Sequence, residues 1–127
     1  MNCAAIDTNI LLYIYLNKVD VFELLEEKGF SRLLIPKMVW EELKKLQNKL
    51  SGEEKIAAGF ALELVEDRCE VVDIHAENTD DSLVNLAQEY GCILVSSDKE
   101  LINKAKTKKV ETAYLREMKK IEFNSGY

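Results

Sequence analysis

Hydrophobic and polar positions along the chain form two alternating patterns, short apolar runs and longer stretches with helical spacing. The apolar runs have the length and composition of buried strands and comprise residues 3–7, 32–36, 70–74, 92–95 and 110–115. The stretches between them have helical spacing and comprise residues 8–17, 20–28, 37–50, 53–67, 80–90 and a segment that begins near residue 98. Strands that alternate with helices predict a mostly parallel sheet covered on both faces. We therefore expect one α/β domain over residues 1–127, with three α/β/α layers.

Two acids directly follow apolar runs of the predicted sheet. Asp7 ends the first run, and Asp98 comes three residues after Val95. Because the carboxyl ends of parallel strands lie along one edge of a sheet, we expect both acids at the edge where such folds hold their active sites. The alternative interpretation is that each acid caps the helix that follows it, a position that Asp favours.

Helical spacing distinguishes two adjacent acids in the segment 37–50. Its apolar stripe recurs every three or four residues, at Val39, Leu43, Leu46 and Leu50. Glu42 borders this stripe, whereas Glu41 has Lys44 and Lys45 as its neighbours on the helix surface. We therefore expect Glu42 to lie at the edge of the core and Glu41 to face solvent.

The segment 80–90 also begins with two adjacent acids. Asp80 lies three and four positions before Leu83 and Val84, so it begins the stripe that faces the core. Asp81 turns away from that stripe, and we expect it to be solvated and at most an outer neighbour of a site. A helix cap is the alternative interpretation for Asp80.

Four acids thus leave or border the predicted core without an obvious basic partner: Asp7, Glu42, Asp80 and Asp98. If they meet in space, their repulsion needs protons or cations as compensation. Carboxylate oxygens are the ligands that Mg²⁺ and Mn²⁺ prefer. We therefore predict a divalent-metal site. Hydroxyl and amide side chains beside the acids would orient the carboxylates or a water molecule, namely Thr8, Asn9 and Ser96.

The chain carries 17 Lys and Arg against 23 Asp and Glu, a formal net charge of −6. This balance excludes a general electrostatic attraction to nucleic acid, although a local basic patch would be compatible with it. Basic residues are frequent between residues 99 and 120 and beside Glu42. From these we select Lys45 and Lys99 as candidate substrate contacts, with solvated helix faces as the alternative.

The positions of the cysteines and the length of the apolar runs indicate in which cellular compartment we expect the protein. The three cysteines, Cys3, Cys69 and Cys92, lie within or beside apolar runs and lack the spacing of a metal site. We therefore expect reduced thiols in the core, as in a reducing cytoplasm. The apolar run Ile10–Leu16 is too short to span a bilayer, so we expect no membrane anchor and no signal peptide.

The order of these motifs resembles that of the PIN-domain ribonucleases, which share a fold and a metal site with 5′ nucleases. The resemblance rests on AIDTNIL, IPKMVWEELKKL and TDDSLVNLAQEYGCILVSSDKEL. It extends through KKVETAYLREMKKIE, where the chain is most like the archaeal and ribosome-processing branch. It implies catalytic roles for Asp7, Glu42, Asp80 and Asp98, which would hold one or two Mg²⁺ or Mn²⁺ ions for the attack of water on RNA phosphodiester bonds. The implied activity is endonucleolytic cleavage of RNA, in RNA processing.

Other functions remain open from the sequence. A non-catalytic PIN module that binds RNA or a protein would keep the fold, and a toxin paired with an antitoxin would use the same chemistry in another role. A receiver domain would need paired acids after the first strand, and a nucleotide-binding Rossmann domain would need a glycine-rich first turn. Neither feature is present. We also expect a homodimer, and no catalytic role for His75.

Overall fold

The computed structural model describes residues 2–116 and 120–124, so residues 1, 117–119 and 125–127 of the expected domain lie outside the described part. The strands are β1 (Cys3–Ile6), β2 (Arg32–Pro36), β3 (Glu70–Val72), β4 (Ile93–Val95), β5 (Thr112–Arg116) and β6 (Lys120–Asn124). The helices are α1 (Thr8–Leu16), α2 (Val21–Glu27), α3 (Lys37–Lys49), α4 (Gly52–Arg68), α5 (Thr79–Tyr90) and α6 (Lys99–Thr107). Strands and helices alternate as predicted, with boundaries that differ by a few residues.

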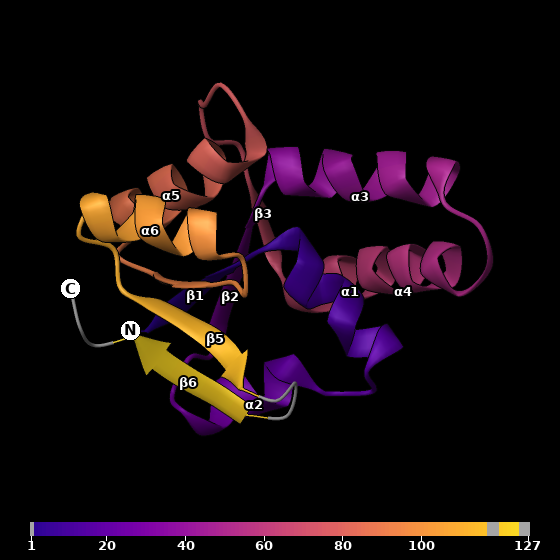
Figure 1. The fold of residues 1–127 in the computed structure, drawn as a ribbon, viewed down its shortest axis with the longest axis horizontal. Coiled ribbons are helices and arrows are strands. Elements are labelled where there is room, and N and C mark those ends of the chain that lie inside the picture. The colour runs from indigo at the N-terminus through magenta and orange to yellow at the C-terminus, as the bar shows by residue number, and fades with distance from the viewer. Residues whose placement is uncertain (1, 117–119, 125–127) are drawn as a thin grey trace.

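The six strands form one sheet in the order β3-β2-β1-β4-β5-β6 (Figure 1). All neighbours are parallel except β5 and β6, which pair antiparallel. The sequence prediction did not include β6. It is a strand of five residues with a single fully buried apolar side chain among those described, Ile121, and its pattern is therefore too short and too polar to stand out.

Helices cover both faces of the sheet and give the predicted three layers. The chain proceeds from β1 to β2 and β3 on one side, then returns to β4 and β5 on the other. Because parallel crossovers are right-handed, this reversal places α1, α3 and α4 on one face and α5 and α6 on the opposite face. In agreement with this, α1 packs on α4 and α5 packs on α6 (Figure 1).

The reversal of direction falls between β1 and β4, at the centre of the sheet. Both strands are fully buried, from Ala4 to Ile6 and from Ile93 to Val95. In open α/β sheets, the carboxyl ends of two such strands border a crevice, because the following segments leave toward opposite faces. Asp7 and Ser96, the residues that directly follow β1 and β4, therefore lie at the position where this fold class places its functional groups.

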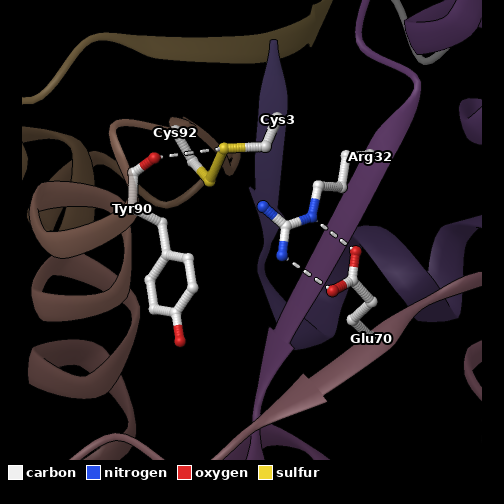
Figure 2. The surroundings of a disulfide bond; sticks show 5 residues. All are labelled: Cys3, Arg32, Glu70, Tyr90 and Cys92. Carbon is white, nitrogen blue, oxygen red and sulfur yellow. Dashed lines mark hydrogen bonds and ion pairs between the residues drawn. A yellow bond between two sulfur atoms is a disulfide. The ribbon is translucent and has the colours of Figure 1, made fainter. Parts of the chain in front are cut away.

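A disulfide joins Cys3, the first residue of β1, to Cys92, directly before β4 (Figure 2). The expectation of reduced thiols was therefore wrong for this pair. The two residues are 89 positions apart in the sequence, but parallel pairing of β1 with β4 brings their Cα atoms within 4.7 Å. Cys69 remains a free, half-buried thiol, as expected, and burial raises its pKa to about 12.

The amino ends of β2 and β3 are joined by an ion pair beside the disulfide (Figure 2). Arg32 donates two hydrogen bonds to Glu70, from Nε at 2.6 Å and from Nη2 at 2.9 Å. Both side chains are substantially exposed, so solvent screens this bidentate pair and it contributes little to stability. In the described part of the chain, none of the helices combines the length and the apolar character needed to cross a membrane.

Candidate active site

Asp7 is buried at the carboxyl end of β1, where the neighbouring strand holds it in place. Its backbone amide donates to the carbonyl of Val95 at 3.0 Å, and its Oδ2 accepts a hydrogen bond of 2.8 Å from the hydroxyl of Ser96. The same Ser96 oxygen accepts the backbone amide of Asp98 at 3.0 Å. The serine hydroxyl thus links the carboxylate of Asp7 to the loop that carries Asp98.

Asp7, Asp80 and Asp98 differ in whether their side chains cap the helix that follows, which was the alternative interpretation of each. Asp7 occupies the N-cap position of α1, but its side chain makes no capping hydrogen bond. Asp98 does cap α6, because its Oδ1 accepts the backbone amide of Glu100 at 2.9 Å. Asp80 caps nothing, since Asn78 is the N-cap of α5. The carboxylates of Asp7 and Asp80 are therefore not consumed by helix capping.

Glu42 approaches the same edge from α3 and is held by Thr8. The buried hydroxyl of Thr8 donates to Oε1 of Glu42, which joins the first turn of α1 to the second turn of α3. Glu42 is half-buried and Glu41 is exposed, as helical spacing predicted. Thr8, which follows Asp7 in the sequence, therefore positions Glu42, another of the four predicted acids.

Burial and mutual repulsion perturb the acids at this edge. Burial raises the pKa of Asp7 from 3.8 to about 6, against hydrogen bonds from Ser96 and from the backbone of Thr8 that favour the charged form. The nearby charges of Asp80 and Asp98 raise the pKa of Asp7 further. The pKa of Asp80 is also raised, first by burial and then by Asp98, with smaller contributions from Glu42 and Asp81 that Lys104 partly offsets.

The four predicted acids thus lie in one region of the molecule and act on one another electrostatically. Among the described residues, no Lys or Arg forms an ion pair with any of them. Within the same residues, however, no three His, Cys, Asp or Glu side chains stand close enough together to form a ready-made metal site. The carboxylate oxygens have the right chemistry for Mg²⁺ or Mn²⁺, but the side chains would have to move to surround an ion.

The remaining predicted residues are exposed or half-buried. Asp81 is half-buried and forms an ion pair of 3.1 Å with Lys104. Asn9 is exposed on α1, and Lys45 and Lys99 are exposed on α3 and α6. His75 is exposed, and only its carbonyl oxygen accepts a hydrogen bond, from the side chain of Asn85.

Two further residues shape this region, and neither was among the site residues predicted from the sequence. Lys104 reaches from α6 to α5 and is the only described cation that lowers the pKa of Asp80. Asn78 caps α5 through the backbone amide of Asp81 at 2.8 Å. The capping signal was present, because Asn precedes a helix with acids in its first turn. The contact of Lys104 depends on the packing of α5 against α6, which no local pattern specifies.

The mostly parallel α/β sheet, with acids beyond the carboxyl ends of β1 and β4, agrees with the fold class expected from the sequence. The chain belongs to the PIN-like domain family, whose model matches residues 4–118, and this confirms the family expected from the motifs. It is similar to Ribonuclease VapC9 of Archaeoglobus fulgidus, with 50% identity over 121 residues that cover 95% of this chain and 88% of that protein. It is also similar to Ribonuclease VapC4 of Methanocaldococcus jannaschii, with 30% identity over 122 residues that cover 91% and 92% of the two chains.

Solved structures share the same fold. The PIN domain endonuclease Utp24 superimposes with a TM-score of 0.73 at 21% identity, over 95% of this chain and 90% of that one. VapBC2 from Rickettsia felis, solved with a DNA fragment from its promoter, gives a TM-score of 0.66 at 18% identity, over 88% and 98% of the chains. At these identities the likeness establishes the three-layer architecture alone.

Proposed function

We propose that this chain is a divalent-metal-dependent endoribonuclease that hydrolyses RNA phosphodiester bonds. The proposal rests on one observation above all: four acids from separate elements gather at the carboxyl ends of the central strands, where their mutual repulsion adds to burial in raising the pKa values of Asp7 and Asp80, and none of the four forms an ion pair with a Lys or Arg that the structure describes. Membership of the PIN-like family and similarity to two proteins named ribonuclease support RNA as the substrate.

The acids that would hold the ion are Asp7, Glu42, Asp80 and Asp98, each in a position that another group maintains. Ser96 fixes the carboxylate of Asp7, and Thr8 fixes Glu42. Asp98 is held by its own backbone amide, which donates to Ser96. When bound, Mg²⁺ or Mn²⁺ would lower the pKa of a water molecule and stabilise negative charge on the phosphate.

Cleavage of single-stranded and structured RNAs in Mg²⁺, Mn²⁺ or chelator tests this proposal. We expect cleavage by the wild type with metal, none with chelator, and a loss of several orders of magnitude in Asp7→Asn. Asp67→Asn is the matched control, because it makes the same chemical change at an exposed residue of α4. Cleavage that resists chelator and is equal in wild type and Asp7→Asn would contradict the proposal.

The similarity to VapC proteins favours one biological role, that of the toxin in a toxin–antitoxin pair. Two of the similar structures are VapBC complexes, which supports a protein partner for this chain as well. Induced expression in a bacterial host tests the role. A toxin should stop growth, and Asp7→Asn at the same protein level should not. Equal growth of both strains would argue for RNA processing instead. The homodimer expected from the sequence stays a prediction, which sedimentation velocity tests.

A further inference from the structure

A cavity of about 450 Å³ opens between α6 and β5, and its lining includes both sequence neighbours of Asp98. Its walls consist of two lysines, an amide, a hydroxyl, an aromatic ring and two aliphatic side chains: Lys99, Lys106, Asn103, Ser97, Tyr114, Ile102 and Leu115. Ser97 and Lys99 flank Asp98 in the sequence, so the cavity begins where the acidic edge ends. No Asp or Glu is among the described residues that line it, although the chain as a whole carries a net charge of −6.

Helix α6 is divided between the core and this cavity. Its buried side contains Leu101 and Ala105, which belong to the hydrophobic core. The cavity side contains residues spaced by three, four and seven positions, which places them on one face of the helix: Lys99, Ile102, Asn103 and Lys106. At a rise of 1.5 Å per residue, the two lysines stand about 10 Å apart along the axis.

The two lysines of the cavity are available to bind an anion. Neither Lys99 nor Lys106 forms an ion pair with a residue that the structure describes. Lys104 lies on the same helix but is already paired with Asp81. The unpaired positive charge of α6 is therefore concentrated on the cavity side.

The remaining walls match the other parts of a nucleotide. Tyr114 is half-buried and presents an aromatic ring, beside the aliphatic side chains of Ile102 and Leu115. Aromatic rings stack on bases of any sequence, and ammonium groups bind the phosphates on either side. The amide of Asn103 can both donate to and accept from the polar edge of a base.

We propose that this cavity is a subsite for one nucleotide of a single-stranded RNA, next to the phosphate that the acids would cleave. The inference rests on the proposed function and extends it by assigning Tyr114 to the base and Lys99 and Lys106 to the flanking phosphates. An acidic protein segment would use the lysines equally well, but it would gain little from an aromatic ring beside an amide. The combination of side chains that line the cavity therefore favours RNA over an acidic protein segment.

Binding of a short, 5′-labelled single-stranded RNA of mixed sequence to the full chain tests the subsite by fluorescence anisotropy in EDTA, where cleavage is absent. Lys106→Ala should weaken binding by roughly ten-fold, and Tyr114→Ala by a similar factor on the order of ten. Lys108→Ala removes the same charge from an exposed residue just beyond α6 that does not line the cavity, and it should change binding by less than two-fold. Tyr114→Phe retains the ring and should bind like the wild type.

Several outcomes would overturn the proposal. Equal losses in Lys106→Ala and Lys108→Ala would mean that only general charge attracts RNA. Unchanged binding by Tyr114→Ala, with an unaltered thermal melt, would remove the base from the subsite. Competition by polyglutamate that depends on Lys106 but not on Tyr114 would assign the cavity to an acidic protein segment. Because this binding is measured without metal, its outcome does not depend on whether the chain cleaves RNA in the test of the proposed function.

Discussion

The hydroxyl of Ser96 lies 2.8 Å from Oδ2 of Asp7, and it joins two residues that are 89 positions apart in the sequence. This buried hydrogen bond favours the charged form of Asp7, against the burial that raises its pKa. Ser96 also accepts the amide of Asp98, so one small side chain sets the relative position of two acids. The site is therefore arranged by uncharged neighbours as much as by the acids themselves.

The raised pKa of Asp7 predicts how the stability of the metal-free protein changes with pH. A carboxyl group with a pKa of about 6 when folded and 3.8 when unfolded binds its proton more tightly in the folded state. Its contribution is therefore fully favourable below about pH 4 and is lost as the pH rises to about 6, a change of about 3 kcal/mol. Asp7→Asn should remove this pH dependence. Urea denaturation of both proteins in EDTA, from pH 4 to pH 7, measures the difference, and parallel curves would contradict it.

Glu42→Gln and Glu41→Gln separate two neighbours on α3. Glu42 is held by Thr8 at the acidic edge, whereas Glu41 is exposed. We expect Glu42→Gln to lower the rate of RNA cleavage by orders of magnitude while the melting temperature changes little. Glu41→Gln should lose at most a weak surface interaction, on the order of 0.5 kcal/mol, and retain near-normal activity. Rates under saturating metal decide the matter, and the reverse order of activities would exclude Glu42 from the site.

Thr8→Val tests the positioning of Glu42, because valine has the shape of threonine without the hydroxyl. The variant should need a higher Mn²⁺ concentration for half-maximal cleavage, by roughly ten-fold if one hydrogen bond to a charged group is lost. Thr8→Ser keeps the donor and should restore the wild-type metal dependence. A merely structural role would instead lower the melting temperature of Thr8→Val and leave its metal dependence unchanged.

Reduction of the disulfide should lower stability, because the Cys3–Cys92 bond closes a long loop in the unfolded chain. The loop-closure model gives roughly 4–5 kcal/mol for a loop of this length. Thermal melts with and without dithiothreitol measure the effect, and Cys69→Ala should show the same shift as the wild type. In Cys3→Ala/Cys92→Ala, dithiothreitol should have no effect. Three reactive thiols in the unreduced, denatured wild type would show that the bond is absent in solution.

The sequence was sufficient to predict what depends on local pattern. Alternating strands and helices predicted the parallel sheet, and helical spacing distinguished the half-buried Glu42 from the exposed Glu41. Two aspartates that follow strands were correctly expected at one edge of that sheet, because parallel strands share a direction.

The sequence alone could not predict features that depend on strand register or on the packing of one element against another. The disulfide follows from the alignment of β1 with β4, and a residue separation of 89 gives no indication of it. Strand β6 pairs antiparallel at the edge of the sheet, where a half-exposed strand shows little apolar pattern. Ser96 was expected to orient a carboxylate or a water molecule. The sequence could not specify Asp7 as its hydrogen-bond partner, since a hydroxyl can bond to many groups.

The disulfide also limits how the acids can relieve their repulsion. Cys3 and Cys92 fasten the amino ends of β1 and β4, and the acids crowd the opposite ends, roughly 13 Å away along a strand. Like charges at the end of two neighbouring strands would ordinarily be free to splay those strands apart. The covalent link holds the two strands together at one end, and the hydrogen bonds of Asp7 to Val95 and Ser96 hold them at the other. We therefore expect Asp7 and Asp98 to relieve their repulsion by rotating their side chains rather than by separation of the strands.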